Sequence, residues 1–597
     1  MAIDPTTQSL PDPDELAQAV TNVAAKSAEV LRAFMQQHGV DVDAEADPFG
    51  LIPAFFELTA SWASNPTKLL DAQFAAWHSY MQIWQQTAQA MLGLQTESVV
   101  KPERGDRRFK DSEWDSNPFF DYLKQTYLVA SGAILSSVEN LDHVDEKTAQ
   151  KIAFFTKQFV DAVSPNNFAA TNPEVIRATI ESGGKNLLDG LQNFLGDIDP
   201  ADGSLKTKMV DTEAFELGRN IAATPGKVVF ETDLMQLIQF EPTTTEVYRR
   251  PLLIVPPWIN KYYVLDLQER NSFIKWATAE GHSVFVVSWV NPDERLATKD
   301  FEDYVFAGPL AALDAIERAT GEREVNIIGY CLGGTLVGAV LAYLAAQNDE
   351  RVQSATFFTS LLDFSDPGDL GVFIDESQVA SLEQTMNARG YLDGGEMAST
   401  FNMLRSTDLI WSFVIHNYLL GKEPVPFDLL YWNNDSTRMP AKMHSTYLRR
   451  MYMDNAFREP GGITIGETPI DLSAIEIPAC FVSAAEDHIA PWKTTFLGAQ
   501  VLSGDVQFIL SKSGHIAGII NPPGPRQYGH FTGPGVKDLS PDEWFAATEA
   551  HEESWWPRWG EWISGYAGDK VPARVPGDRE LEVLEEAPGS FAKNRLG

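Results

Sequence analysis

Apolar residues recur every three or four positions through the first third of the chain, which is the spacing of an amphipathic helix. In the clearest case the apolar side chains follow alternating steps of four and three: Leu70, Phe74, Trp77, Met81, Trp84, Ala88 and Met91. This stripe predicts a helix of about seven turns. A weaker stripe precedes it, at Leu16, Val20, Val23, Val30 and Phe34. Residues 1 to about 210 are therefore predicted to form an all-helical N-terminal domain.

The aromatic-rich stripe over residues 70–91 has two interpretations. It can pack against other helices of the same domain, as most apolar helix faces do. It can also dock a partner subunit or another apolar body, because it is larger than one small domain needs. The pattern alone leaves both open.

After about residue 210 the pattern changes to short apolar runs that alternate with helical patterns. This alternation is typical of a mostly parallel α/β sheet with helices on its faces. Eight runs are predicted to be strands: residues 227–232, 235–240, 251–255, 283–289, 324–329, 354–359, 478–483 and 506–510. Residues 211–597 are therefore predicted to form a second, larger domain.

One interval of this second domain, residues 362–472, has no clear strand–helix unit and is rich in aromatic side chains. An insertion at this point lies over the carboxyl edge of the sheet, where α/β proteins bind ligands. The interval is therefore a candidate lid. The tryptophans near the C-terminus are instead predicted to pack terminal helices onto the sheet: Trp544, Trp555, Trp556, Trp559 and Trp562.

Composition and charge restrict the class of protein. The chain has 597 residues, 44% of them hydrophobic, which is enough for more than one core. Its net charge of −37 argues against sequence-independent nucleic-acid binding and against an anionic membrane surface. Two cysteines, Cys331 and Cys480, are too few for a disulfide framework. Because neither a signal peptide nor a membrane span is recognisable, we expect a soluble cytoplasmic protein.

The strongest chemical signal lies in residues 324–346. A predicted strand leads into Gly329-Tyr330-Cys331-Leu332-Gly333-Gly334, and a predicted helix follows. This order is that of a nucleophile elbow, with Cys331 where hydrolases usually have serine. The glycines let strand and helix approach closely, and the helix N-terminus beneath the sulfur favours the thiolate. Cys480, inside an apolar run, is predicted to be a core residue.

A nucleophile in this architecture is followed along the chain by an acid and then by a histidine. The loop after residues 478–483 contains Glu486-Asp487-His488, and the loop after residues 506–510 contains His515. Asp487 and His515 are the predicted acid and base, with Glu486 and His488 as their rivals. The histidines show no compact ligand spacing, so no metal is expected.

Two backbone amides are expected to bind the oxyanion. One is the amide of Leu332, directly after the nucleophile. The other comes from the loop after the third strand, where Trp258 and Ile259 are the candidates. Lys261 in the same loop is either a solvated loop charge or part of the site.

The choice of cysteine hints at the reaction. A thiolate that attacks a thioester forms another thioester, so the acyl group stays activated for transfer, whereas serine would form a less reactive oxoester. The nucleophile thus favours a thioester donor and an acyltransferase. The alternative is a hydrolase with a cysteine nucleophile, acting as a thioesterase or esterase.

The residues resemble the class I polyhydroxyalkanoate synthases over most of the chain. The box Gly-x-Cys-x-Gly-Gly at residues 329–334 is complete. Further segments that look like the family's are residues 106–109, 164–168, 256–263, 425–430, 486–492 and 513–518. The resemblance implies an α/β-hydrolase fold with an inserted lid, preceded by the helical domain. It places the family's catalytic residues on Cys331, Asp487 and His515.

The resemblance also implies an activity and partners. The family polymerises (R)-3-hydroxyacyl-CoA, typically 3-hydroxybutyryl-CoA, into polyester and releases CoA, with no additional cofactor. Its members act as homodimers on polyester granules. Their N-terminal region is implicated in association with the granule and with granule-associated proteins. A catalytically silent granule-binding or scaffolding protein is a further alternative.

A polyanionic CoA thioester needs local cations on so acidic a protein. Candidates in the insertion and late loops are Arg405, Arg449, Arg450, Lys493 and Arg526, although each alone is more simply a surface charge. Ala517, two residues after His515, is expected to help shape the acyl pocket. Trp258, Arg405 and Ala517 are the predicted substrate-binding residues.

Overall fold

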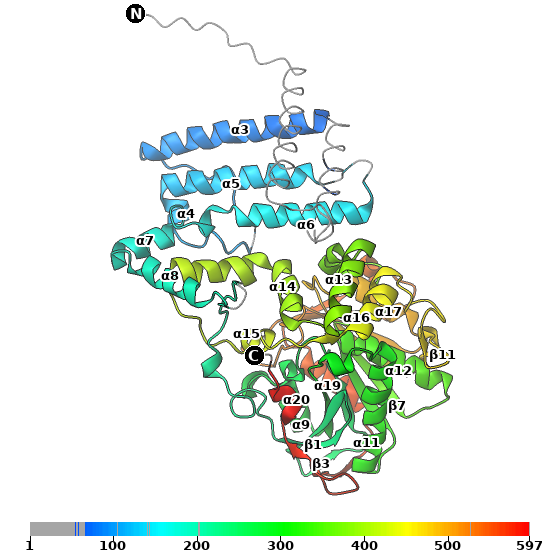
Figure 1. The fold of residues 1–597 in the computed structure, drawn as a ribbon. Coiled ribbons are helices and arrows are strands. Elements are labelled where there is room, and N and C mark those ends of the chain that lie inside the picture. The colour runs from blue at the N-terminus through cyan, green and yellow to red at the C-terminus, as the bar shows by residue number, and fades with distance from the viewer. Residues whose placement is uncertain are drawn as a thin grey trace, which may run out of the picture. The chain divides into compact units, whose positions relative to one another are not determined.

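The computed structural model describes residues 54, 58, 66–103, 105–139, 141, 144–200, 203, 205–525 and 527–595 (Figure 1). The chain divides into two units, residues 1–176 and residues 177–597. The predicted stripe at residues 16–34 lies outside the described residues, as does Arg526. No helix in the described ranges is long and apolar enough to cross a membrane.

The boundary at Ile176 comes earlier than the predicted boundary near residue 210. Helix α8 (Lys185–Gly196) packs on the π-helix η9 (Val414–Leu419) of the second unit. The Asn186 amide donates to the carbonyl of Leu419 at 2.8 Å, and the Tyr418 hydroxyl donates to Asp197 at 2.8 Å. These contacts place the last predicted helical segment in the second unit.

The first unit is helical, as predicted. Its elements are α3 (Pro66–Met91), α4 (Glu113–Ser116), α5 (Pro118–Ser137), α6 (Glu146–Ala162) and the 3₁₀ turn η1 (Pro165–Asn167), and α7 (Pro173–Ser182) spans the boundary. Helices α3 and α5 pack along each other. Asn117 and Asp145 cap α5 and α6 by accepting hydrogen bonds from the first-turn amides.

The face of α3 that packs inward is not the predicted apolar face. Ile83 is fully buried there together with polar Gln86. The Gln86 amide donates to Asp121 at 3.1 Å, and the Gln125 amide donates to Gln86 at 2.7 Å. Lys124, also buried, pairs with Asp121 at 3.0 Å. A satisfied polar network therefore fills the space between α3 and α5.

The apolar stripe of α3 is consequently exposed. Phe74 and Trp77 are each 62% exposed and Trp84 is 63% exposed, and Met81 and Met91 are exposed as well. The interpretation of these side chains as packing within the helical domain is wrong. The interpretation as a docking face is the one that matches their exposure.

The second unit is built on a large sheet. Within the described residues the sheet has eleven strands in the order β15-β14-β13-β12-β7-β6-β4-β5-β2-β1-β17. Their bounds are β1 (Gly226–Glu231), β2 (Met235–Phe240), β4 (Leu252–Val255), β5 (Val284–Trp289), β6 (Val325–Tyr330), β7 (Val352–Phe358), β12 (Ala479–Ala484), β13 (Val506–Ser511), β14 (His530–Thr532), β15 (Glu549–His551) and β17 (Glu585–Glu586). Strands β5, β4, β6, β7, β12 and β13 run parallel, and the outer strands pair antiparallel. Every predicted strand is present, with ends within two residues of the prediction.

Helices cover both faces of this sheet, because the buried parallel strands are apolar on both sides. Along β6, Val325 and Ile327 belong to one core, and Ile328 and Tyr330 belong to the other. One face carries α10 (Phe301–Val305), η6 (Phe306–Leu310), α11 (Ala311–Thr320), α12 (Leu332–Ala346), α17 (Trp492–Val501) and α18 (Pro541–Ala546). The opposite face carries α9 (Phe273–Ala279), α19 (Trp556–Ser564) and α20 (Gly589–Lys593). Trp544, Trp555, Trp556 and Trp559 are fully buried, as predicted, whereas Trp562 is partly exposed.

The interval 362–472 is a mostly helical insertion. Its elements are η7 (Gly368–Phe373), α13 (Glu376–Arg389), β8 (Tyr391–Leu392), α14 (Gly394–Leu404), η8 (Thr407–Trp411), η9, α15 (Asp428–Asn433), β9 (Met439–Pro440), α16 (Ala441–Tyr447), η10 (Leu448–Met453), β10 (Thr464–Ile465) and β11 (Thr468–Pro469). Gly368 packs directly on the carbonyl of His488, because a Cβ at that glycine would lie 2.5 Å from the oxygen. The insertion thus touches a loop at the carboxyl edge of the sheet, as the lid prediction requires.

Candidate active site

Cys331 lies in a sharp turn between β6 and α12. Its backbone has φ 53° and ψ −122°, a conformation that costs a non-glycine residue about 1–3 kcal/mol. Cys331 is partly buried, and its sulfur side chain packs against both cores. A strained residue held at the start of a helix is the geometry of a nucleophile elbow.

The glycines around Cys331 are required by close backbone approach. A Cβ at Gly329 would lie 2.4 Å from the Cα of Gly334, and a Cβ at Gly333 would lie 2.1 Å from the carbonyl oxygen of Val255. A Cβ at Gly334 would lie 1.9 Å from the hydroxyl of Ser360. The elbow therefore packs closely against the ends of β4 and β7 and against its own helix. Side chains larger than that of glycine do not fit at these three positions.

Asp487 and His515 come together at the same edge of the sheet. They follow β12 and β13, which are neighbouring parallel strands. Nδ1 of His515 lies 2.7 Å from Oδ2 of Asp487. Oδ1 of Asp487 accepts the amides of Ile489 and Ala490, each at 2.9 Å. Both carboxylate oxygens are thus occupied, and the side chain is fully buried.

The rival residues are placed differently. Glu486 is exposed, whereas its neighbour Asp487 is the carboxylate in contact with the histidine. Burial lowers the pKa of His488 to about 4, with His515 and Arg405 lowering it further and Asp487 opposing them. A histidine with so low a pKa is a weak base and is poorly suited as the base of a triad.

His515 bonds to Asp487 and interacts electrostatically with Cys331. Burial by itself lowers the pKa of His515, but the charges of Asp487 and Cys331 and hydrogen bonds to both side chains raise it well above the ordinary value of 6.5. The imidazole also stacks on the ring of Tyr330 at 5.9 Å. The contact with Asp487 therefore favours a protonated imidazole at His515.

The loop that carries His515 is held by two tryptophans that the sequence pattern assigned only to packing. The indole N–H of Trp555 donates to the carbonyl of Gly518 at 2.8 Å. The indole N–H of Trp556 donates to the carbonyl of Ile519 at 2.9 Å. The sequence pattern of the Trp-Trp pair gives no sign of this function, because the bonded carbonyls lie far away in sequence.

The start of α12 lies against the loop that follows β4. The close approach of Gly333 to Val255, and to Pro256, brings the amide of Leu332 alongside this loop. Ile259 is partly buried there, and its carbonyl accepts from the amide of Thr437 at 3.2 Å. The placement is compatible with the predicted oxyanion amides of Leu332 and Ile259.

Two residues of this loop differ from their predicted roles. The ring of Trp258 is buried in the core, with its centroid 4.6 Å from that of Tyr304 and 5.6 Å from that of Trp289, so it presents no exposed surface to a substrate. Lys261 is buried rather than solvated and pairs with Asp435 at 2.8 Å. Burial lowers the pKa of Lys261, and Asp435 opposes that effect.

The Lys261 ammonium also fastens the C-terminal segment. It donates to the carbonyls of Ala592 and Asn594, each at 2.8 Å. Arg595 lies 3.4 Å from Asp435, and its guanidinium covers the ring of Tyr431 at 4.0 Å. The loop after β4, the lid and the last described residues therefore share one buried cluster of charges.

The predicted CoA-binding cations that the structure describes are paired with acidic neighbours. The pairs are Arg405 with Asp408 at 2.5 Å, Arg449 with Glu383 at 2.7 Å and Glu376 at 2.9 Å, Arg450 with Asp454 at 2.7 Å, and Lys493 with Asp542 at 2.6 Å. Arg405 is half exposed and is close enough to His488 to lower its pKa. It is thus near the catalytic loops, and Ala517 is partly buried within the His515 loop.

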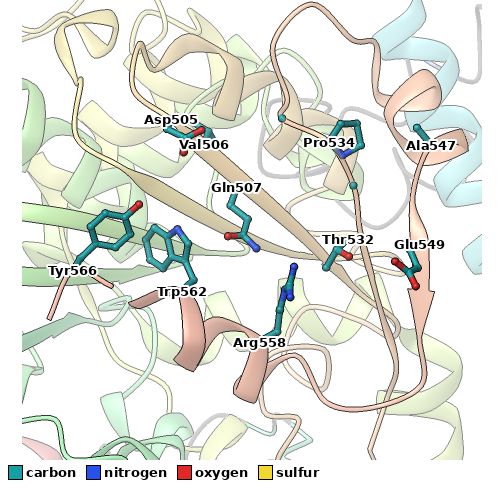
Figure 2. A pocket seen from close by; sticks show the side chains of 12 residues that line it. Asp505, Val506, Gln507, Thr532, Pro534, Ala547, Glu549, Arg558, Trp562 and Tyr566 are labelled. Carbon is teal, nitrogen blue, oxygen red and sulfur yellow. The ribbon is translucent and has the colours of Figure 1, made fainter. Parts of the chain in front are cut away.

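A pocket of about 500 Å³ lies at the opposite edge of the sheet (Figure 2). Gln507, Thr532 and Arg558 point toward one another across it, and Trp562 and Tyr566 line one side. It adjoins the start of β13, whereas His515 follows the end of that strand. A strand of this length separates the two by about 17 Å, so this pocket is not part of the Cys331 site.

Comparisons with known proteins agree with this geometry. Residues 105–277 match a family described as "Poly-beta-hydroxybutyrate polymerase (PhaC) N-terminus", and residues 250–522 match the alpha/beta hydrolase fold. The chain is 45% identical to the poly(3-hydroxyalkanoate) polymerase subunit PhaC of Rhizobium meliloti (strain 1021), over 98% of this chain and 96% of that protein. It is 46% identical to the poly(3-hydroxyalkanoate) polymerase of Methylorubrum extorquens, over 89% of this chain and 88% of that protein.

Some solved structures resemble about half of the chain. The monoacylglycerol lipase of Paleococcus ferrophilus is 15% identical, with a TM-score of 0.30 over 47% of this chain and 90% of that chain.

Proposed function

The chain belongs to the poly(3-hydroxyalkanoate) polymerases, a family of acyltransferases, and on that basis we propose that it polymerises (R)-3-hydroxyacyl-CoA through an acyl thioester on Cys331. The observation that supports this chemistry is the contact of His515 with Asp487 beside a strained cysteine. The matching family's description, a poly-beta-hydroxybutyrate polymerase, favours 3-hydroxybutyryl-CoA as the substrate.

Acylation uses the groups already described. The Cys331 thiolate attacks the thioester carbonyl, and the amides of Leu332 and Ile259 stabilise the oxyanion, each such donor contributing about 2.7–4 kcal/mol. His515 gives its proton to the departing CoA sulfur, so CoA leaves as a neutral thiol and the acyl group stays on Cys331. Because the pKa of His515 is raised, its imidazole is protonated at neutral pH and can supply that proton.

Elongation requires the 3-hydroxyl of an acyl unit to become a nucleophile. We propose His515 as the base, because after acylation its imidazole is neutral. Asp487 is a weaker candidate, since its two oxygens are already occupied by His515, Ile489 and Ala490 and its side chain has no exposed surface. The lid excludes the water that would otherwise compete with the hydroxyl.

Arg405 is the cation proposed for the CoA phosphates. It is half exposed, lies in the lid, and acts electrostatically on His488 next to the catalytic acid. Its partner Asp408 is also partly exposed, so their ion pair is weak and can be exchanged for a phosphate. Ala517 is proposed to line the acyl pocket beside His515.

The exposed stripe of α3 supports a granule-binding role for the first unit. Phe74, Trp77 and Trp84 form an aromatic face on one side of the helix. A neutral aliphatic polyester suits this face better than an anionic bilayer, because the protein carries a net charge of −37. We propose that the stripe docks on the polyester surface in the cytoplasm. A homodimer, which the family resemblance implies, is proposed on that basis alone.

Incubation of the purified protein with (R)-3-hydroxybutyryl-CoA tests the function. We expect thiol release together with turbidity and a sedimenting polyester. Cys331→Ala should abolish both, while Cys480→Ala, at a buried core position, should retain both. Thiol release accompanied only by soluble 3-hydroxybutyrate would identify a thioesterase instead, and unchanged release by Cys331→Ala would overturn the assignment of the nucleophile.

A further inference from the structure

Tyr330, the residue directly before the nucleophile, lies against the proposed base, His515. It ends strand β6, and its side chain is buried in the core on the α19 side of the sheet. Its ring lies at an angle of 24° to the plane of the His515 imidazole, with the two centroids 5.9 Å apart. Its hydroxyl donates to the backbone carbonyl of His515 at 3.4 Å. One side chain therefore contacts both the ring and the backbone of the same histidine.

These two contacts add to the bond between His515 and Asp487. The carboxylate holds the imidazole only at Nδ1, and a ring bonded at one atom can still tilt about that bond. The ring of Tyr330 packs on the face of the imidazole and limits this tilt. The hydroxyl holds the carbonyl of the residue from which the imidazole projects. The base is thus held at an edge, on a face and at its backbone.

Tyr330 is itself firmly placed. It pairs with Phe358 of the neighbouring strand β7, and the next amide, that of Cys331, donates to the Phe358 carbonyl at 2.8 Å. The ring of Phe358 lies 6.4 Å from that of Tyr330 and 5.1 Å from that of Trp555. Trp555 in turn donates to the carbonyl of Gly518 in the loop after β13. A row of buried aromatic rings therefore connects the strand of the nucleophile to the loop of the base.

The stacked ring also favours the charged form of the histidine. A cation within about 6 Å of an aromatic centroid is attracted by the ring face, and the imidazole of His515 meets that distance. The protonated imidazole is the form that gives its proton to CoA in the proposed reaction. Burial, with smaller contributions from the charges of Cys331 and Asp487, raises the pKa of Tyr330 well above its ordinary value of 10.0. The hydroxyl therefore keeps the proton that it donates to the carbonyl.

These contacts lead to an assignment that rests on the function proposed above. We propose that Tyr330 is a positioning residue that acts through His515: its ring supports the face of the imidazole, and its hydroxyl fixes the carbonyl of the same residue. Because Tyr330 is bonded covalently to Cys331, this support stays fixed relative to the nucleophile. The tyrosine makes and breaks no bond in the reaction.

NMR titration of His515 tests the proposal without the polymerase substrate. The full chain carries isotopically labelled histidine, and the signal of His515 is the one that His515→Gln lacks. In Tyr330→Leu we expect the pKa of His515 to fall by about 0.4 or more, because the attraction between ring and cation is lost. Tyr330→Phe keeps the ring and should change this pKa by less than about 0.2. Both variants retain the other ionisable side chains that act on His515, namely Asp487, Cys331 and His488.

CoA release provides the second measurement. Tyr330→Phe should lower kcat about threefold, the size of effect of a hydrogen bond between neutral groups. Tyr330→Leu should lower kcat about tenfold or more, because the imidazole is then misplaced. In both variants KM should change by less than about twofold, because the lost contacts are not with the substrate. Tyr330→Phe also provides a test by itself if Tyr330→Leu does not fold.

The matched control is Tyr127, a buried tyrosine of α5 in the first unit. Its hydroxyl also donates to a backbone carbonyl, that of Val160, at 3.0 Å. Tyr127→Leu and Tyr127→Phe therefore remove the same groups from a buried position outside the site. We expect them to lower the stability of the first unit but to leave the pKa of His515 and kcat unchanged.

The outcomes separate this proposal from the proposed function. If the pKa of His515 is the same in Tyr330→Leu as in the unmodified protein, or if Tyr127→Leu lowers it equally, the assignment is overturned. Full kcat in Tyr330→Phe would overturn the part assigned to the hydroxyl. If the pKa falls as expected but the substrate yields only free acid, the polymerase proposal fails and the positioning role of Tyr330 stands.

Discussion

Nδ1 of His515 lies 2.7 Å from Oδ2 of Asp487, a carboxylate with no exposed surface. The same imidazole is influenced by the charge of Cys331. The protonation of the His515 imidazole therefore depends on both neighbouring groups.

Neutralising the acid is expected to change the pH dependence of the enzyme. In Asp487→Asn the pKa of His515 should fall, because the largest charge that raises it is removed. CoA release should fall about 10³-fold or more, as when the orienting carboxylate of a triad is lost. Stopped assays of CoA release, together with NMR titration of His515, measure the two effects. Unchanged titration of His515 would contradict the electrostatic account.

The same residue links pH to stability. The pKa of His515 is higher in the folded protein than its ordinary value of 6.5, so the charged imidazole stabilises the fold fully below about pH 6.5, and this contribution is lost as the pH rises through the raised value. In Asp487→Asn the free energy of unfolding should therefore fall less steeply with pH above 6.5. Denaturant unfolding at several pH values checks this slope.

A methyl group at Gly333 should disrupt the elbow. The added Cβ would lie 2.1 Å from the carbonyl oxygen of Val255, and backbone at the sheet edge cannot move easily to accept it. We expect Gly333→Ala to lower the free energy of unfolding by about 2 kcal/mol or more and to lower Tm. Gly196→Ala is the control, since a Cβ on that α8 glycine meets nothing within 4 Å. Equal Tm values for the two variants would contradict the close approach.

Removing one indole donor should loosen the loop that carries His515. Trp555→Phe keeps an aromatic ring but loses the hydrogen bond to the Gly518 carbonyl. The expected cost is about 1–3 kcal/mol, because that carbonyl is left buried without its donor, and kcat should fall about tenfold through misplacement of the imidazole. Chemical denaturation and CoA release measure both. Trp562→Phe, at a partly exposed tryptophan of the same helix, should leave kcat unchanged.

Polar substitutions on α3 should weaken binding to polyester without unfolding the protein. Trp77 and Trp84 are 62% and 63% exposed, so the double variant Trp77→Ser, Trp84→Ser should change the free energy of unfolding by less than about 1 kcal/mol. Co-sedimentation with preformed polyhydroxybutyrate particles should fall about tenfold or more, as expected for the loss of two large anchors. The control is Gln82→Ser, Gln85→Ser, two exposed polar positions on the same helix. Comparable loss of sedimentation by the control would refute the stripe as the docking face.

The sheet and the order of its catalytic loops could be predicted from the sequence for a physical reason. Buried parallel strands are short apolar runs, and such runs stand out between amphipathic helices. Once β6, β12 and β13 are located, the residues that follow them must share an edge of the sheet. Cys331, Asp487 and His515 are placed by that topology, and the structure brings Asp487 and His515 into direct contact.

The sequence pattern was misleading where polar groups are buried. The inner face of α3 contains Gln86, which bonds to Asp121 and Gln125, and periodicity assigns such residues to the outside. The burial of Lys261 could not be predicted either, because its partner Asp435 belongs to the lid, which is distant in sequence. In both cases burial depends on a partner far away in sequence.

Other features depend on contacts between segments that periodicity does not relate. Asp363, in the loop after β7, accepts hydrogen bonds from Asn455 and Arg458, which come much later in the sequence. The unit boundary at Ile176 likewise follows from the packing of α8 on η9. The aromatic residues within the long insertion predicted a lid, but they did not predict how the lid is oriented over the sheet.

The buried cation at Lys261 connects the far end of the polypeptide to the reacting centre. It binds the carbonyl of Ala592, in the last turn of α20, and that of Asn594, directly after this helix. Its own loop contains the amide of Ile259. We expect a protease that trims these terminal residues, or an extension fused tightly to them, to disturb the loop that contains Ile259. The C-terminal segment is therefore mechanically connected to the loop beside the candidate active site, and we expect labels or tags inserted there to lower turnover.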